Sequence, residues 1–306
     1  MIHVLGDLNV DLILSGMTVP PAFGKEIIGT ERSMAPGGST ANVAIILAST
    51  SVPVRFFGCV GNDFYGDFLV STLQSYGMNT DTVARTDRDR TCITVSLTYP
   101  NDRMFITDLG TLKSNTLADF PAGYLADAEH LHLGSFFLQI GLRPSIGQLL
   151  EDARANGMTT SLDMGGDPAD TWDISDLLPA LPCLDWFVPN ADEITGITGC
   201  STVPDALAAF DENATGIIVK AGADGAYSRC NGEIRHHPGT VVEVVDTTGA
   251  GDCFNAGFLS AICSGATLDD AAKRGNEWGA AAVRCLGLPI ADENRPALSK
   301  NANVER

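Results

Sequence analysis

The segment of this sequence with the most chemical content is "DTTGAGDCFNAG", which runs from Asp246 to Gly257. Apolar residues recur at helical spacing after the turn, which predicts a helix that begins near residues 249–251. The first N–H groups of a helix bind anions, and glycine lets the backbone approach a ligand closely. Asp252 would repel a resting phosphate, but it could take a proton from a hydroxyl that attacks a phosphoryl group. The structural alternative is an ordinary N-cap after a tight turn.

Short apolar runs and helical patterns alternate along the rest of the chain. Segments such as "IHVLGDL", "VRFFGCVG", "HLHLGSF" and "GIIVKAG" have the character of buried strands, and "STANVAIILAST" and "SIGQLLEDARANG" that of helices. This order predicts an α/β fold with a doubly wound, mostly parallel sheet flanked by helices. Ligands bind such sheets beyond the carboxyl ends of the strands. We expect residues 1–306 to form a single domain.

Two segments interrupt the alternation. Residues 13–35 resemble a loop that is rich in proline and glycine, and residues 90–112 show strand alternation around a Pro-Asn-Asp turn at 100–102. The second segment predicts an antiparallel hairpin. Together the two insertions predict a small β-sheet that lies over the main domain as a lid.

Composition excludes several classes of function. The chain has 306 residues, of which 44% are hydrophobic, and 38 acidic residues against 19 basic ones give a net charge of -19. The sequence has no basic block, which argues against nucleic acid and anionic membrane as partners. It has no apolar run of the roughly 18 residues that a membrane span needs. Its N-terminal segment lacks the basic region and the cleavage site of a signal peptide, and we expect it to form the first strand of the domain. We therefore expect a cytoplasmic protein.

The cysteines and histidines show no metal-binding or redox pattern. The eight cysteines form no CxxC pair, and no histidine lies at zinc spacing, so we expect reduced and mostly buried thiols. Of the five histidines, His130 and His132 alternate on a strand, and His236 and His237 are expected in a turn. All five are interpreted as structural. The polar residues 291–306 are expected to pack loosely.

Five segments of the sequence resemble the motifs of one known family. "DTTGAGDCFNAGF" resembles the second signature of the ribokinase-like (PfkB) carbohydrate kinases. Four further segments resemble family motifs in the family's order, namely the first strand "GDLNVDLI" at 6–13, the first signature "GGSTANVA" at 37–44 with "GCVGNDFYG" at 58–66, the magnesium motif "PNADE" at 189–193 and the nucleotide-binding turn "VKAGADGA" at 219–226. The resemblance implies transfer of the γ-phosphoryl group of Mg-ATP to a hydroxyl of a small sugar, with a primary hydroxyl expected.

The resemblance also assigns the groups that carry out the transfer. Asp252 is the base, as the chemistry of the turn had indicated independently. The backbone of Gly249, Ala250 and Gly251 forms the anion hole. An unperturbed aspartate is a weak base, so its contribution is positioning and the acceptance of a proton late in the transfer.

A second set of residues is expected to bind the sugar. These residues are Asp11, Asn9, Gly37, Gly38 and Asn42. A carboxylate that accepts from two hydroxyls suits a polyol, and the two glycines allow the backbone to approach it closely. The alternatives are a cap or turn role for the aspartate and a helix-start hydrogen bond for Asn42.

The nucleotide and cation sites complete the implied assignments. ATP is expected at Asn190, Lys220, Gly222 and Asn276, with Mg2+ held by Glu193 largely through water. The alternatives are a capping arrangement after the proline at 189 and a surface position for the lysine.

Many family members bind a monovalent cation near the anion hole. Asp246 and Thr248 match the positions of that site, which implies K+. The resemblance further implies a homodimer that forms through the lid.

One departure from the family weakens the interpretations as ribokinase proper and as a phosphosugar kinase. Ser39 follows the paired glycines where ribokinase proper and the phosphosugar kinases carry lysine. Without that cation a phosphosugar substrate is less favoured, because a phosphate prefers Lys or Arg. Arg90 and Arg103 in the lid segment keep the possibility open.

Two more functional classes would fit the same fold. A nucleoside kinase would need an apolar slot for the base, which Phe23, Met104 and Phe105 could supply. A catalytically silent sugar-binding relative is less favoured, because such a protein has no need of the aspartate base.

Overall fold

The computed structural model describes residues 1–99, 103–210, 216–285 and 288. Its α-helices are α1 (Ser39–Ser49), α2 (Phe64–Ser75), α3 (Ile146–Ala155), α4 (Ala191–Thr198), α5 (Val203–Ala208), α6 (Ala250–Ile262) and α7 (Leu268–Ala282). Its strands are β1 (Ile2–Leu5), β2 (Asn9–Ser15), β3 (Glu31–Gly37), β4 (Val54–Gly61), β5 (Val83–Thr86), β6 (Cys92–Thr98), β7 (Arg103–Asp108), β8 (His130–Leu133), β9 (Thr159–Leu162), β10 (Trp186–Phe187), β11 (Gly216–Lys220), β12 (Gly225–Cys230) and β13 (Glu233–Pro238).

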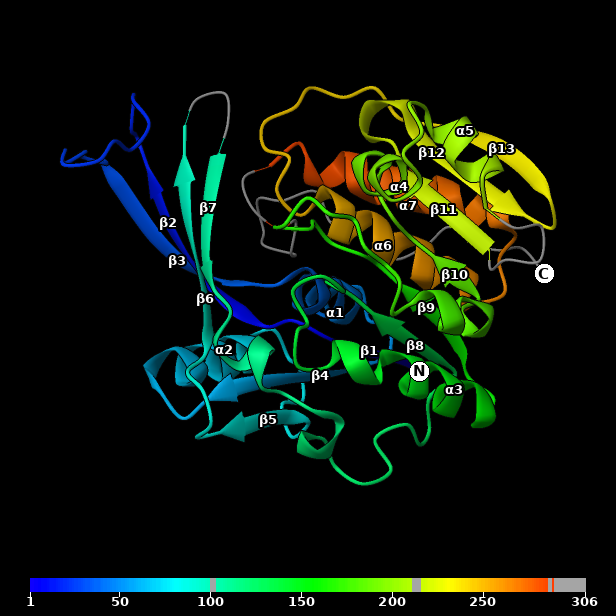
Figure 1. Cartoon of the computed structure of the whole chain (residues 1–306), viewed down its shortest axis with the longest axis horizontal. Coiled ribbons are helices and arrows are strands. Elements are labelled where there is room, and N and C mark those ends of the chain that lie inside the picture. The colour runs from blue at the N-terminus through cyan, green and yellow to red at the C-terminus, as the bar shows by residue number, and fades with distance from the viewer. Residues whose placement is uncertain (100–102, 211–215, 286–287, 289–306) are drawn as a thin grey trace.

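A large sheet, called here the main sheet, runs through the centre of the molecule. Within the described residues its order is β13-β12-β11-β10-β9-β8-β1-β4-β5 (Figure 1). From β1 the chain first builds outward through β4 and β5, and then it builds the other side from β8 onward. Strands β12 and β13 are antiparallel to their neighbours, whereas the pairs from β11 to β5 are parallel. The predicted doubly wound, mostly parallel sheet is confirmed.

Helices cover both faces of the main sheet, and successive strand residues point into opposite layers. On β1, Val4 packs into the cluster under α1, α2, α6 and α7, whereas Leu5 packs into the cluster under α3, α4 and α5. Phe56 and Phe57 on β4 divide in the same way. A strand with two buried faces needs apolar residues at consecutive positions. This requirement explains why the strands are continuous apolar runs in the sequence.

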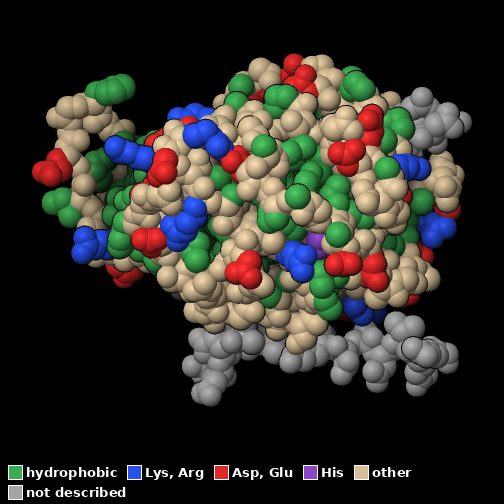
Figure 2. All heavy atoms as spheres, turned by 90° about the horizontal axis from the view of Figure 1, so that it is seen from below, with side chains coloured by type: hydrophobic (Ala, Val, Ile, Leu, Met, Phe, Trp, Pro, Cys, Tyr) green, Lys and Arg blue, Asp and Glu red, His purple; other side chains and the backbone are tan. Residues whose placement is uncertain are grey.

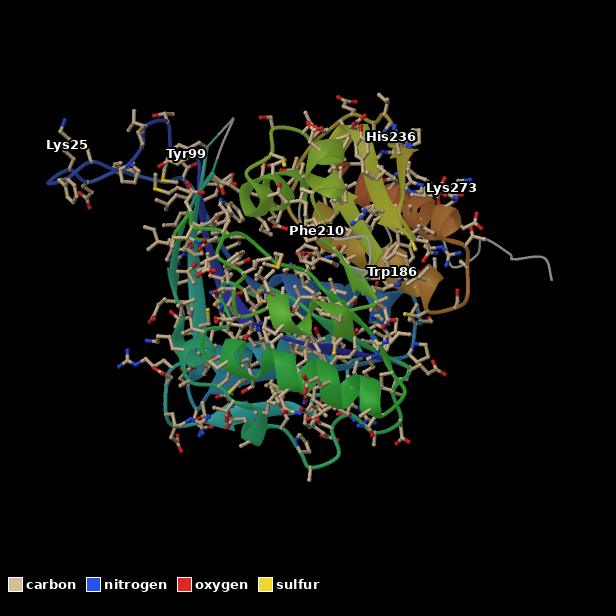
Figure 3. All side chains as sticks on the ribbon, turned by 45° about the vertical axis from the view of Figure 1, so that its right-hand side comes forward. Lys25, Tyr99, Trp186, Phe210, His236 and Lys273 are labelled. Atoms are coloured by element: carbon tan, nitrogen blue, oxygen red, sulfur yellow. The ribbon has the colours of Figure 1, made fainter. Side chains whose placement is uncertain are left out.

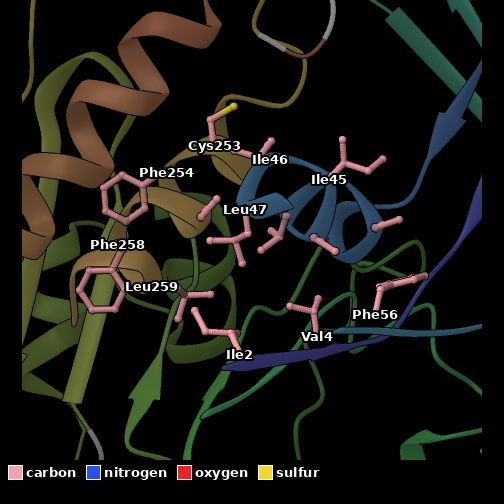
Figure 4. Close-up of a cluster of buried hydrophobic side chains, with 14 of the residues drawn as sticks. Ile2, Val4, Ile45, Ile46, Leu47, Phe56, Cys253, Phe254, Phe258 and Leu259 are labelled. Carbon is pink, nitrogen blue, oxygen red and sulfur yellow. The ribbon is translucent and has the colours of Figure 1, made fainter. Parts of the chain in front are cut away.

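The layer that positions the site is the contact between α1 and α6. Figure 4 shows Leu47 of α1 on the side of the helix that faces Leu259 of α6 and Ile2 of β1, and both leucines are completely buried. Burial of each such side chain stabilises the fold by about 1.5–3 kcal/mol. The packing holds the two helices together along their length, so that their N-terminal turns meet.

A second sheet, called here the small sheet, projects from the main domain (Figure 1). Within the described residues its order is β3-β2-β6-β7, with β2 parallel to β6 and the other pairs antiparallel. In Figure 3, Lys25 lies at the tip of the projection, away from Trp186 in the main sheet. The hairpin predicted in 90–112 is found as β6 and β7, although the turn at 100–102 lies outside the described residues.

The first insertion differs from its prediction. Residues 13–35 were expected to be a loop, but β2 continues to Ser15 and β3 begins at Glu31. The sequence "ERSMAPG" hides its strand because the first three residues are exposed and polar, which removes the alternation. The connection between these strands is the irregular part.

The predictions for two histidines, for the cysteines and for the tail have different outcomes. His236 and His237 lie on strand β13, so the prediction of a turn at these residues is wrong. None of the eight cysteines, all within the described residues, forms a disulfide, as predicted. Only Cys59, Cys92 and Cys253 are buried, however, and the other five are partly exposed. The tail 291–306 lies outside the described residues.

The surface carries mixed charge. Figure 2 shows acidic and basic side chains interspersed over one face, with hydrophobic side chains exposed on the projecting small sheet. Among the helices of the described residues, none combines the length and the apolar character that crossing a bilayer requires.

Candidate active site

The carboxyl edge of the main sheet gathers polar side chains from four strands. Asp7 follows β1, Asp163 follows β9, Asn190 follows β10, and Lys220 ends β11. Parallel strands present their carboxyl ends at one edge, and this edge is where an α/β sheet binds ligands. The sequence had indicated this edge in general terms.

Helix α6 begins at this edge, as the sequence predicts. Gly249 is its N-cap and adopts a left-handed conformation with φ 73°, and a Cβ there would lie 2.5 Å from the side chain of Leu288. Both constraints favour glycine. The N–H of Ala250 makes a long hydrogen bond of 3.3 Å to the carbonyl of Thr247. The remaining N–H groups of the first turn have no partner within a helix, which is the general basis of anion binding at this position.

The carboxylate of Asp252 projects from this first turn and is held on both oxygens. The hydroxyl of Ser39 donates to Oδ1 at 2.6 Å, and Nδ2 of Asn42 donates to Oδ2 at 2.8 Å. Burial raises the pKa of Asp252 to about 6, against the lowering effect of these two hydrogen bonds. At neutral pH the group is therefore largely charged, and it is a stronger base than an ordinary aspartate.

The first turn of α1 is fixed by an aspartate from another strand. Gly38 is the N-cap of α1 with φ 101° and has no side chain to cap the helix. Asp7 takes over this role, because its carboxylate accepts from the N–H of Ser39 at 3.1 Å and from the N–H of Thr40 at 2.9 Å. Asp7 was not among the predicted site residues, although its place directly after the first strand was an available signal.

The expected sugar residues lie together beside this turn. Nδ2 of Asn9 donates to Oδ1 of Asp11 at 2.7 Å, and burial raises the pKa of Asp11 to about 6. A Cβ at Gly37 would lie 2.4 Å from that same Oδ1, so only glycine allows the two strands to approach this closely. The carboxyl group, the amide and the glycine thus form one polar surface.

The small sheet reaches the main domain at this point. Arg103 of β7 donates a hydrogen bond to Oγ1 of Thr248, and its positive charge lies close enough to lower the pKa of Asp11. By contrast, Phe23, Met104 and Phe105 are exposed, so the structure does not assemble them into an apolar slot.

A cavity of about 580 Å³ extends from Asp252 along the carboxyl edge. Its polar lining includes Ser39, Glu193 and Lys220 in addition to Asp252. Its apolar lining is contributed mainly by Val241, Val242, Val244, Phe254, Ala280 and Val283. One cavity therefore combines a charged part beside the carboxylate with an apolar part large enough to hold a planar ring.

The other expected nucleotide residues line the same cavity. Gly222 adopts a left-handed conformation with φ 58°. Nδ2 of Asn276 donates to the carbonyls of His237 and Pro238 at 2.9 and 3.2 Å, which fixes the end of β13 against α7. The side chain of Asn276 is thus occupied by the backbone.

Lys220 is a buried ion-paired lysine and not a surface one. Its Nζ lies 2.6 Å from Oδ2 of Asp163, and Asn255 hydrogen bonds to both groups. Burial, the largest single effect, lowers the pKa of Lys220, but the charges of Asp163 and Glu193 and the hydrogen bond to Asp163 together keep the pKa above its ordinary value. Asp163 and Asn255 were not among the predicted site residues, although Asn255 lies one helical turn after the predicted base.

Asn190 and Glu193 form a capping box at the start of α4. The N–H of Glu193 donates to Oδ1 of Asn190 at 2.9 Å, while the N–H and Nδ2 of Asn190 each donate to the Glu193 carboxylate at 2.8 Å. The capping arrangement is therefore present, and the same carboxylate also lines the cavity. Burial raises the pKa of Glu193 to about 7, and the charge of Asp163 adds to the shift.

These carboxylates suit a cation that is held through water. Asp163, Glu193 and Asp252 face the cavity with only Lys220 as a counter-charge among the described lining residues. No three His, Cys, Asp or Glu side chains of the described residues come together to ligate a metal directly. Mg2+ keeps several of its waters and needs few protein ligands, so the donor set fits it.

The predicted monovalent-cation residues lie in the turn before α6. Oδ1 of Asp246 accepts from the N–H of Thr248 at 2.9 Å and from its hydroxyl at 2.7 Å. This local network fixes the turn, and its carboxylate and hydroxyl oxygens are hard donors of the kind that suits an alkali cation. The Thr248 hydroxyl also accepts a hydrogen bond from Arg103.

Comparison with known proteins defines the class. The family model of the pfkB family carbohydrate kinases matches residues 1–294, and the chain belongs to this family. The chain is 27% identical to 2-dehydro-3-deoxygluconokinase of Bacillus subtilis, over 98% of each chain. It is 30% identical to aminoimidazole riboside kinase of Salmonella typhimurium, over 98% of this chain and 96% of the relative.

A solved structure shares the architecture. A fructokinase double mutant from Vibrio cholerae, with fructose, ADP and potassium ion bound, superimposes with a TM-score of 0.75 at 25% identity, over 94% of this chain and 93% of that chain. The fold is therefore ribokinase-like. The protein is a sugar or nucleoside kinase that uses ATP and transfers a phosphoryl group to an alcohol.

Proposed function

We propose that this protein transfers the γ-phosphoryl group of ATP to a primary hydroxyl of a small sugar, with Asp252 as the base. One observation carries the proposal most directly. The Asp252 carboxylate stands at the N-terminus of α6, in the wall of a cavity that also has an apolar part suited to adenine. A base and an anion-binding helix start then act on the same phosphoryl group.

The reaction balances with the residues present. The sugar oxygen forms a bond to the γ-phosphorus, the bond from that phosphorus to the bridging oxygen of ADP breaks, and the hydroxyl proton passes to the Asp252 carboxylate. The backbone from Gly249 to Gly251 holds the charge that develops on the phosphoryl oxygens. Mg2+, held through water at Glu193, would neutralise phosphate charge when it is bound.

The sugar would lie between the small sheet and α1. Asp11 would accept hydrogen bonds from its hydroxyls, and Asn9 would donate hydrogen bonds to them. Gly37 and Gly38 would allow the ring to approach the backbone. Asn42 contacts Asp252 in this structure, so its proposed role extends from the sugar to the base.

The small sheet, built mainly from 13–35 and 90–112, would act as the lid of one domain spanning 1–306. Its closure over the sugar would exclude water and limit the hydrolysis of ATP. The contact from Arg103 to Thr248 supports this role, because it connects the small sheet to the turn that precedes the anion hole.

The nucleotide would occupy the rest of the cavity. Asn190, Lys220 and Gly222 would line its phosphates and ribose, and Asn276 the region of the adenine. The Lys220 ammonium is already paired with Asp163, so it would contribute a fixed positive field and not a mobile contact.

A potassium ion at Asp246 and Thr248 is part of the proposal. The potassium-bound state of the Vibrio cholerae fructokinase supports it, together with the hard oxygen donors of this turn. A homodimer through the small sheet is also proposed.

Two relatives favour different acceptors. The 2-dehydro-3-deoxygluconokinase name indicates an acidic sugar, and the aminoimidazole riboside kinase name indicates a nucleoside-like acceptor. The exposed positions of Phe23 and Phe105 give the nucleoside alternative no apolar slot in this conformation. A phosphosugar would depend on Arg103, the cation that reaches the site from β7.

The test is ADP release with Mg-ATP and K+ across free sugars, sugar acids, phosphosugars and nucleosides. We expect strong activity with one free sugar or sugar acid. Strong activity with nucleosides alone would replace the proposed acceptor class. ATP binding without transfer to any acceptor would contradict the proposed reaction.

A further inference from the structure

The base carboxylate is held in a two-point hydrogen-bonded clamp that spans two distant parts of the chain. Ser39 donates to Oδ1 of Asp252, and Asn42 donates to Oδ2. Each carboxylate oxygen can accept a second hydrogen bond, so a free lone pair remains on both oxygens. The clamp therefore fixes the plane of the carboxylate without blocking it.

The two donors are themselves fixed. Ser39 and Asn42 are three residues apart and lie on the same face of α1. The N–H of Ser39 is held by Asp7, and the N–H of Asn42 donates to the carbonyl of Gly38 at 2.9 Å. Since α1 packs along α6, neither donor can follow Asp252 if the aspartate rotates away.

The Ser39 hydroxyl is one of the groups that set the pKa of Asp252, so its removal should change that pKa measurably. Burial raises the pKa of Asp252, the donors Ser39 and Asn42 lower it, and the more distant Asp163 and Lys220 act in opposite directions. Arg103 of the small sheet donates to Thr248, and its charge acts on Asp11. The serine hydroxyl is neutral, so it orients the carboxylate without forming an ion pair with it.

We propose, resting on the function proposed above, that Ser39 is a positioning residue whose hydroxyl aims the Asp252 carboxylate at the acceptor hydroxyl. The proposal depends on the chemical type of the side chain at position 39. Alanine removes the donor, threonine keeps it, and lysine replaces it with a cation that would compete for the base.

The experiment compares Ser39→Ala, Ser39→Thr and Ser39→Lys with the wild type, each purified as the full chain. We measure kcat and the KM for ATP from about pH 5 to about pH 9, a range that spans the raised pKa of the base. Ser39→Ala should lower kcat about tenfold, with an unchanged KM for ATP. It should also move the acidic limb of the pH profile of kcat to higher pH, because the lost hydrogen bond had lowered the pKa of Asp252. Ser39→Thr should show the wild-type pH profile, and Ser39→Lys should move the acidic limb to lower pH.

A matched control and a second readout complete the design. Ser49→Ala removes a serine hydroxyl from the other end of α1, where it donates to the carbonyl of Ile46, and should change neither kcat nor the profile. An NMR titration of labelled aspartate carboxyl carbons, with Asp252→Asn for assignment, reports the same shifts without turnover.

Each outcome decides one of the two proposals. Unshifted kinetic and NMR titrations in Ser39→Ala would overturn the role of Ser39. An inactive wild type would contradict the proposed function, and the NMR shifts would still decide whether Ser39 controls Asp252. Equal losses in Ser39→Ala and Ser39→Thr would show that the site requires the serine for packing alone and would also overturn the proposal.

Discussion

At the scale of single residues, Asp252 concentrates the expected chemistry. Asp252→Asn keeps the size of the side chain but cannot take a proton, so we expect kcat to fall about a hundredfold to ten-thousandfold. ATP binding should change little, because the cavity and the helix start remain. The measurements are ADP release and calorimetric ATP binding.

The control for this prediction is Asp67→Asn on the surface of α2, where the carboxylate pairs with Arg85. This variant should retain full activity. Transfer at the wild-type rate in Asp252→Asn would show that another group accepts the proton.

The buried pair of Lys220 and Asp163 supports a second prediction. Asp163→Ala leaves a buried ammonium without its counter-charge, which we expect to reduce the free energy of unfolding by about 3–5 kcal/mol. The double variant Asp163→Ala and Lys220→Met removes both charges and should recover part of this loss. Urea unfolding measures both. A loss below about 1 kcal/mol in the single variant would show that the pair is solvated.

The sequence predicted the individual residues of the site better than their contacts. Asp252 and the glycines follow from local rules, since a helix start and a tight turn are encoded within a few positions. The contact between Ser39 and Asp252 spans 213 positions, and that between Asp163 and Lys220 spans 57. Such pairs depend on which helices pack together, which no local pattern encodes.

At the scale of elements, predictability follows the strength of the periodic pattern. The predicted α1 and α6 are found, because their apolar stripes are long and their glycine boundaries clear. Strand β3 was missed because its exposed start carries no alternation. The small sheet, which we propose as the lid, was thus predicted only in its hairpin of β6 and β7.

The exposed edge of the small sheet leads to a prediction about assembly. Strand β7 is exposed along its whole length and carries Met104, Phe105 and Ile106, with Ile106 58% exposed. A long apolar edge strand promotes association unless another surface covers it. We expect the wild type to be a dimer in light scattering, and Ile106→Glu to be a monomer with unchanged circular dichroism.

The matched control is Ile234→Glu on β13, where the side chain is also exposed but lies at the far edge of the main sheet. This variant should remain dimeric. A monomeric wild type would contradict the dimer, and dissociation by both variants would exclude the small sheet as its specific interface.

At the scale of the whole molecule, titratable groups whose pKa values are shifted in the folded state couple folding to pH. Burial lowers the pKa of His130 to about 3 and that of His132 to about 4. Burial raises the pKa of Asp11 and Asp252 to about 6. The two sets act in opposite directions as the pH falls, so the pH dependence of the wild type alone does not isolate either of them.

The last prediction isolates one histidine by difference. The folded pKa of His132 lies below its unfolded value, so the unfolded chain binds the proton first, and the stability that the neutral ring supplies is lost as the pH falls from about 6.5 toward 4. His132→Asn keeps a polar atom near the hydroxyl of Ser161, which His132 contacts through Nδ1 at 2.8 Å, but it does not titrate. The variant should therefore gain stability relative to the wild type by about 1.4 kcal/mol for each pH unit between about pH 6 and about pH 4, and no more below that range. Urea unfolding at several pH values measures this difference. A constant difference between the two proteins would show that the ring is already protonated or hydrated in the folded state.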